Sequence, residues 1–243
     1  MKNIFLLFAF AVATTTHAQQ FINSGTIEYE VRIGNHKMIK PGTVWGDLAK
    51  QNLPEFSTLY YSLAFADNKA LYKFERQNEK PKISLGFNMN NEDDTWYSDY
   101  TNNTYTNARY IIDDMYLLSG QLRNIEWKLV PNENREIAGF NCRKAYAVIY
   151  DSVYVFAFYT DEITVTGGPM GIHGLPGMIL GLTIPRMYAS WVATKMQLAA
   201  GTKKIIAPQK GKKKDPAELK ASVQKMNNNY LTDGQQTLWH YFL

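Results

Sequence analysis

The chain has 243 residues, of which 45% are hydrophobic and 14% aromatic, and its formal net charge is +4. A chain of this length can bury a sizeable core without disulfides, and the one cysteine, Cys142, excludes an internal disulfide or a closed tetrahedral zinc site. The positive charge comes from a lysine cluster beyond Gly201 that lacks arginine and interleaved aromatic residues, which argues against nucleic-acid binding.

The first 18 residues follow the order of an export signal. Lys2 gives a positive start, residues 4–13 are apolar, and Thr16 and Ala18 suit a small-residue cleavage site. We therefore expect a mature chain that begins at Gln19. No cysteine follows the cleavage site for lipidation, and no later segment reaches the roughly 20 apolar residues of a membrane helix. The sequence predicts a protein of the periplasm or extracellular space, with outer-membrane association left open.

Alternation of apolar and polar residues dominates the chain as far as residue 200 and predicts strands. Residues 27–33 alternate clearly, and residues 60–77 read as two strands around a turn at Asp67. We expect a turn at residues 132–134 and a short helix over residues 44–51. Further strands are predicted over residues 82–87, 95–100, 104–112, 125–130, 142–150, 153–160, 178–184 and 187–197. Such a series predicts an all-β fold, a large antiparallel meander curled into a bowl-like or open-barrel sheet that protects its edges.

The segment from Gly174 to Leu182, GLPGMILGL, joins dense turn residues to an apolar run. Pro176 fixes its own φ and Gly177 can adopt a positive φ, so residues 175–178 are predicted to form a type II turn. The following strand should end at Pro185.

A basic tail follows the predicted β domain. Residues 201–214 read as a lysine-rich linker, and Asp215 is predicted to cap a helix in which Pro216 occupies the first turn. Leu219, Val223 and Met226 share the narrow apolar stripe of that helix, and the last residues, 238–243, are again largely apolar. We therefore divide the chain into a signal segment (1–18), a β domain (19–200), and a basic linker, helix and apolar tail (201–243).

Several local patterns together resemble the GLPGLI family of exported bacterial proteins. The resemblance runs roughly from residue 24 to 198, with Met178 in place of the usual leucine. It implies a β-rich envelope or secreted protein of uncharacterised role, and a likeness to bowl-like accessory domains of secreted glycan-processing enzymes. It implies no catalytic residues. The matching residues are Gly174, Leu175, Pro176, Gly177, Met178 and Ile179 in the signature, and Cys142, Lys144, Ala145, Tyr159, Thr160, Ile163, Gly168 and Pro169 before it.

Residues with chemical potential are sparse. A hydrolase triad would need His173 with a poised serine or Cys142 and an orienting acid, and no nucleophile-elbow pattern is present. Cys142, Met170, His173 and Met178 carry ligand types that suit Cu(I), but we favour core packing for the sulfur-containing residues and a loop position for His173. We predict no catalytic residues, no metal site and no cofactor.

Aromatic residues offer a different possibility, a ligand-binding surface. If the sheet curls, half of the aromatic side chains face its concave side, where they would either line a pocket or pack a core. The expected function is therefore binding of a hydrophobic, glycan or peptide ligand, or of another envelope protein. A secreted hydrolase or glycan-processing accessory and a copper-binding protein are the alternatives. The lysines between Lys203 and Lys214 provide a candidate contact with the anionic envelope surface. The aromatic set comprises Tyr72, Trp96, Tyr97, Tyr100, Tyr105 and Tyr110.

Overall fold

A computed structural model describes residues 22–39, 42, 44–78, 92–111, 114–150, 152–198 and 204–230. The predicted signal segment, the predicted strand over residues 82–87 and the apolar end of the tail lie outside these residues. The strands are β1 (Gly25–Gly34), β2 (Phe56–Ala66), β3 (Lys69–Gln77), β4 (Thr95–Asp99), β5 (Thr104–Ile111), β6 (Asp114–Gln121), β7 (Lys128–Ile137), β8 (Phe140–Ile149), β9 (Val153–Thr160), β10 (Met178–Ile184), β11 (Ala189–Leu198) and β12 (Lys212–Lys213). The helices are α1 (Asn35–Met38), α2 (Val44–Asn52) and α3 (Pro216–Tyr230), with short 3-10 turns η1 (Pro169–Gly171) and η2 (Pro185–Met187).

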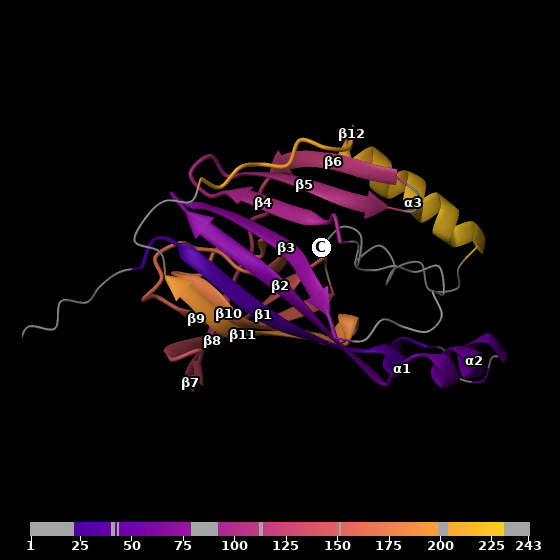
Figure 1. Ribbon diagram of the computed structural model, residues 1–243, viewed down its shortest axis with the longest axis horizontal. Coiled ribbons are helices and arrows are strands. Elements are labelled where there is room, and N and C mark those ends of the chain that lie inside the picture. The colour runs from indigo at the N-terminus through magenta and orange to yellow at the C-terminus, as the bar shows by residue number, and fades with distance from the viewer. Residues whose placement is uncertain are drawn as a thin grey trace, which may run out of the picture.

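These strands form one twelve-stranded sheet in the order β12-β6-β5-β4-β3-β2-β1-β11-β10-β9-β8-β7. All neighbours are antiparallel except β12, which runs parallel to β6. Figure 1 shows the sheet curving so that β4, β5 and β6 stand over the layer that contains β8 to β11. Over the described residues the sheet stays open, with β12 and β7 at its two edges. The predicted all-β, curled sheet with a C-terminal helix is thus confirmed.

The two faces of the sheet differ in the way that the alternation predicts. In β1, the side chains of Ile27, Tyr29 and Val31 are fully buried on the concave side. The intervening Glu28 lies on the outer face, where it pairs with the guanidinium of Arg76 on β3 at 2.6 Å. The core therefore lies inside the curve of the sheet, and the outer face carries ion pairs.

The signature segment fills this concave space. Leu175, Met178 and Ile179 are fully buried, and the Tyr29 hydroxyl donates a hydrogen bond to the Ile179 carbonyl at 2.6 Å. Gly177 has the positive φ that was predicted, +136°. The type II turn itself is wrong, because the Gly177 amide donates to the Leu175 carbonyl at 2.7 Å, which closes a tighter γ-turn around Pro176.

The described part of the tail packs on the sheet. Asp215 caps α3 as predicted, and its Oδ1 accepts the amide hydrogens of Ala217 and Glu218 at 2.9 and 3.0 Å. Leu219 and Val223 of α3 are buried in a small second core with residues of β5 and β6. No helix within the described residues is long and apolar enough to cross a membrane.

Some features of the fold differ from the sequence predictions. Strand β6 and the single-turn helix α1 were not predicted. The expected turn at residues 132–134 is wrong, because β7 continues through it. The extra residues are absorbed by a register shift between Leu129 and Asn134, where Asn132 takes a φ of +62°.

Candidate ligand cleft

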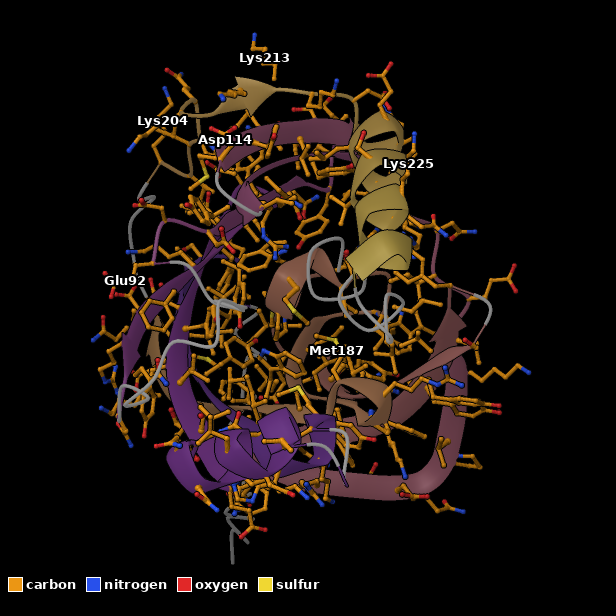
Figure 2. All side chains as sticks on the ribbon, turned by 90° about the vertical axis from the view of Figure 1, so that its right-hand side faces the viewer. Glu92, Asp114, Met187, Lys204, Lys213 and Lys225 are labelled. Atoms are coloured by element: carbon orange, nitrogen blue, oxygen red, sulfur yellow. The ribbon has the colours of Figure 1, made fainter. Side chains whose placement is uncertain are left out.

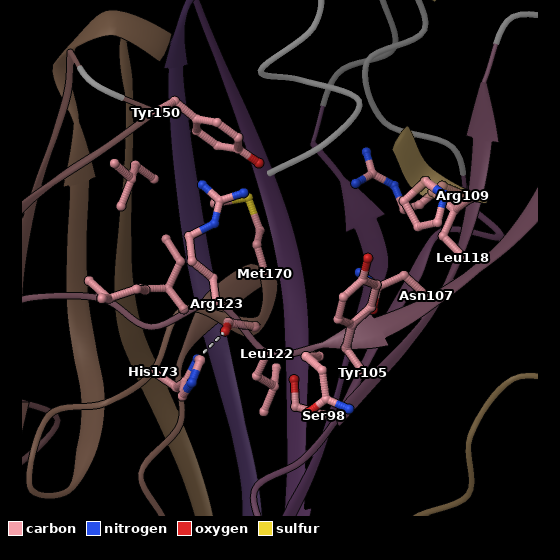
Figure 3. Close-up of a pocket in the computed structure, with 16 residues that line it drawn as sticks. Ser98, Tyr105, Asn107, Arg109, Leu118, Leu122, Arg123, Tyr150, Met170 and His173 are labelled. Carbon is pink, nitrogen blue, oxygen red and sulfur yellow. Dashed lines mark hydrogen bonds between the residues drawn. The ribbon is translucent and has the colours of Figure 1, made fainter. Parts of the chain in front are cut away.

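A cleft of about 210 Å³ opens on the concave side of the sheet, between β4, β5 and the start of α3. Its other wall is formed by the connection after β6, the turn after β8 and the segment that follows η1 (Figure 3). A smaller hollow of about 30 Å³ shares Arg109 and Met170 with it. Many other described side chains on the concave side are buried in the core, and this larger cleft is the candidate ligand site.

Strand alternation places a row of polar side chains on the cleft floor. Ser98 of β4 stands opposite Tyr105 of β5, and Trp96 stands opposite Asn107. Because residues two apart on a strand share a face, Tyr105, Asn107 and Arg109 all point to the concave side. The Asn107 side-chain oxygen also accepts the Tyr97 amide at 3.2 Å, which fixes the orientation of this carboxamide.

Arg109 is the most buried charged group of the cleft. Its side chain is 3% exposed and its Nε pairs at 3.2 Å with Oδ2 of Asp94, which is 4% exposed. The Asp94 Oδ1 accepts the Tyr110 amide at 2.6 Å, and the Arg109 guanidinium lies 4.2 Å from the centre of the Trp96 ring. A buried charge at a cleft needs such compensation, which here comes from a carboxylate and an aromatic face. Asp94, the last residue of the acidic run 92–94, therefore supplies a structural ion pair.

The opposite wall carries Arg123 and Tyr150. The Arg123 guanidinium lies 3.6 Å from the centre of the Tyr150 ring, and the ammonium of Lys220 on α3 lies 4.9 Å from the same ring. Figure 3 shows Arg123 and Arg109 extending from opposite sides of the cleft. Neither Arg123 nor Tyr150 was identified from the sequence, because each lies in a connection without a motif.

His173 lies at the base of the cleft and is half-buried. Its Nδ1 is 3.0 Å from the Gly171 carbonyl, and its own carbonyl accepts the Trp127 indole N–H at 2.8 Å. Burial lowers the pKa of this imidazole below its ordinary value, so the ring is neutral at pH 7. Ser98 also lines the cleft, but no hydrogen bond joins it to His173. In a hydrolase triad, an acidic side chain contacts the Nδ1 of the histidine and orients the ring. Here the Gly171 carbonyl occupies that position.

The four candidate copper ligands divide between two environments. Met170 and His173 line the cleft, whereas Cys142 and Met178 are fully buried in the core. The Cys142 thiol contacts the Phe140 carbonyl at 3.5 Å. Within the described ranges, no three histidine, cysteine, aspartate or glutamate side chains gather in a way that could hold a metal ion.

We expect the Cys142 thiol to resist modification in the folded protein. Burial raises its pKa to about 12, so almost none of it is thiolate at neutral pH. Labelling with a thiol reagent at pH 8 should proceed only as guanidinium unfolds the chain. Cys142→Ala should cost about 1–2 kcal/mol of unfolding free energy through lost packing. Rapid labelling of the native protein, or sub-micromolar Cu(I) binding that Cys142→Ala abolishes, would contradict the core assignment.

Two residues of the predicted aromatic surface, Tyr72 and Trp96, are packed in the core. Tyr72 and Trp96 are 1% and 6% exposed, and the Tyr72 ring stacks on that of Tyr61 with centroids 4.8 Å apart. The Trp191 indole donates to the Tyr72 hydroxyl at 3.0 Å, which satisfies a polar group inside the core. Of the predicted set, Tyr105 lines the cleft. The concave face is therefore a core with a cleft at one end.

The fold and the cleft define an all-β protein with a single curled open sheet. No protein-family model and no curated protein matches the chain. Among solved structures it is similar to PNGF-II in its P21 crystal form, with a TM-score of 0.53 and 18% identity over 84% of this chain and 33% of that one. The chain thus spans about a third of PNGF-II, and at this identity the likeness concerns the fold alone.

Two further comparisons have lower scores. PNGF-II in its C2 crystal form gives a TM-score of 0.48 and 16% identity over 89% of this chain and 32% of that one. An uncharacterised conserved protein from Thermus thermophilus gives 0.36 and 7% identity over 77% of this chain and 90% of that one.

Proposed function

We propose that this chain is an exported binding protein of the GLPGLI type, which holds a small ligand in its concave cleft. The observation that carries the proposal is an open cleft with mixed lining in an otherwise filled sheet. Leu118, Leu122 and Ile149 supply apolar walls, and Asn107 and Tyr105 supply hydrogen-bonding groups. Small-molecule sites combine apolar walls with placed polar groups, and the polar share of this lining suits a polar ligand.

The size and chemistry of the cleft support binding over catalysis. At about 210 Å³ it is smaller than the roughly 300–1,000 Å³ of drug-sized pockets, so it suits one sugar ring or an amino acid. Its lining includes neither a carboxylate nor a cysteine, and its serine and histidine are not hydrogen-bonded to each other. The described lining of this cleft therefore lacks the nucleophile–base pair or the paired carboxylates of a hydrolase.

A nuclear magnetic resonance titration tests the binding proposal. A panel of monosaccharides, amino acids and short peptides should include a ligand that shifts the backbone amides of Ser98, Asn107 and His173 saturably. Ile125→Trp, which places a large ring in the cleft lining, should abolish the shifts. Glu126→Trp, the exposed neighbour, should preserve them. Shifts confined to the outer face of the sheet, or none for the whole panel, would contradict the proposal.

The export part of the proposal has its own test. The order of charge, apolar run and small residues before Gln19 motivates it. Intact-mass measurement of the protein from its host should give a chain that begins at Gln19, recovered from the periplasm or the medium. Full-length protein in the cytoplasm would contradict export and leave the cleft proposal standing.

We also propose that the basic tail contacts anionic envelope surfaces. Lys204 and Lys213 are exposed, and Figure 2 shows both at the edge of the molecule near Asp114. Their neighbour Lys212 is engaged by Asp114 at 2.7 Å. Exposed lysines at a sheet edge attract anionic lipid headgroups in a salt-dependent way.

A further inference from the structure

Two positive side chains converge on one aromatic ring at the mouth of the cleft. The Arg123 guanidinium and the Lys220 ammonium lie 3.6 and 4.9 Å from the centre of the Tyr150 ring. They come from separate parts of the chain, the connection after β6 and the helix α3. The ring stands at the β8–β9 turn, where Tyr150 has a left-handed φ of +48°. Two positive groups gathered around one side chain repel each other, so the arrangement favours a negative group nearby.

No carboxylate of the described residues neutralises this pair. Arg109 is compensated by Asp94, and Lys214 by Glu218 at 3.3 Å. Asp215, at the start of α3, uses its Oδ1 to cap that helix. Among the described residues, Arg123 and Lys220 form no ion pair, and their charged groups contact the Tyr150 ring.

We propose that the cleft recognises an anionic group on its ligand, a carboxylate or a phosphate, and that Arg123 and Lys220 bind it. The inference rests on the proposed binding function and names the ligand class for the same cleft. The planar guanidinium of Arg123 matches the two oxygens of such a group, and Lys220 adds a point charge. The apolar wall at Leu122 and Ile149 strengthens the attraction by excluding water on one side. Asn107 and Tyr105 remain for the uncharged part of the ligand.

Binding of this kind would also join the tail to the sheet. Lys220 belongs to α3, whose other described contacts with the sheet include the buried Leu219 and Val223. A ligand held by both Lys220 and Arg123 bridges α3 and the connection after β6. Anion binding should therefore slow amide hydrogen exchange in α3 as well as in the cleft.

The test uses inorganic phosphate, acetate and glucose as probes on the full mature chain, with sodium chloride matching the ionic strength. Phosphate or acetate should shift the Arg123 Nε–H and Tyr150 amide resonances saturably, with half-saturation near about 1–10 mM for a lone anionic group. Comparison of the phosphate titration with the acetate titration shows whether the cleft prefers a phosphate or a carboxylate group. Arg123→Gln and Lys220→Gln should each raise the half-saturating concentration about tenfold.

Arg135→Gln is the matched control. Arg135 is also an exposed arginine over an aromatic ring, 4.8 Å from the centre of Phe158, but it stands on the edge strand β7 outside the cleft. Its loss should leave the titration unchanged. An unchanged titration in Arg123→Gln and Lys220→Gln, or no saturable shift by 100 mM of either anion, would overturn the inference. If glucose saturates the cleft while both anions fail, the anion inference falls and the binding function stands. If every probe and the ligand panel fail, both fall.

Discussion

Replacing Gly177 with alanine is expected to lower the free energy of unfolding by at least about 3 kcal/mol, among the largest effects for one methyl group. A Cβ atom at this position would lie 2.0 Å from the Thr160 carbonyl oxygen and 2.7 Å from its carbon. Both are backbone atoms of a strand paired on each side, so they cannot move aside as a flexible side chain would. The φ of +136° adds conformational strain for any residue with a Cβ.

Gly139→Ala separates the clash from the strain. Gly139 also has a positive φ, +84°, but a Cβ there would meet no atom within 4 Å. Alanine at this hairpin turn should cost only about 1–2 kcal/mol, the strain of a left-handed backbone. Guanidinium unfolding followed by circular dichroism measures both variants. If Gly177→Ala costs no more than Gly139→Ala, the close approach of the two backbone segments is wrong.

This clash also gives a physical reason for the spacing of the sequence patterns. Thr160 belongs to the Tyr159-Thr160 element and Gly177 to the signature, and the two are distant in sequence. The pairing of Met178 with Thr160 across β9 and β10 brings them together. Cys142 and Ala145 from the earlier element are fully buried in the same core. The patterns thus mark residues that pack against one another inside the sheet. The sequence predicted a positive φ at Gly177, but local turn rules contain no information on the distant strand that approaches it.

Most strands were predictable because alternation follows directly from a sheet with one buried face. The exceptions have local causes. Strand β7 passes through residues 132–134, typical turn formers, because it lies at an edge where a bulge is tolerated. Helix α3 was found through Asp215, whose capping chemistry is entirely local.

The cleft was less predictable than the fold. Asn107 and Arg109 share a face with Tyr105 by alternation, so a polar row on β5 could be found from the sequence. The opposite wall could not, because Tyr150 reaches the cleft from a distant turn and Lys220 of α3 contacts its ring. The ion pair of Asp94 could not be predicted either, for a related reason. An acid in a polar run resembles a solvated turn until the strand opposite presents Arg109 to it.

Asp94→Asn is expected to cost about 3–5 kcal/mol of unfolding free energy. The substitution keeps the shape of the side chain and an acceptor for the Tyr110 amide, but it removes the negative charge beside Arg109. Arg109 is 3% exposed, so water cannot replace the lost carboxylate, and an uncompensated buried charge is costly. Thermal and guanidinium unfolding measure the loss.

Asp161→Asn is the matched control, because Asp161 pairs with Arg143 at 2.7 Å while their side chains are 60% and 48% exposed. That surface pair should be worth less than about 1 kcal/mol, since solvent screens both charges. Arg109→Met added to Asp94→Asn should recover part of the stability, because the double variant buries neither charge. A double variant as unstable as the sum of its single substitutions would show that the two groups do not act as a pair. The cleft floor would then be held by the stacking of Arg109 on Trp96, and a conservative Arg109→Lys change, which weakens that stacking, should be the more damaging substitution.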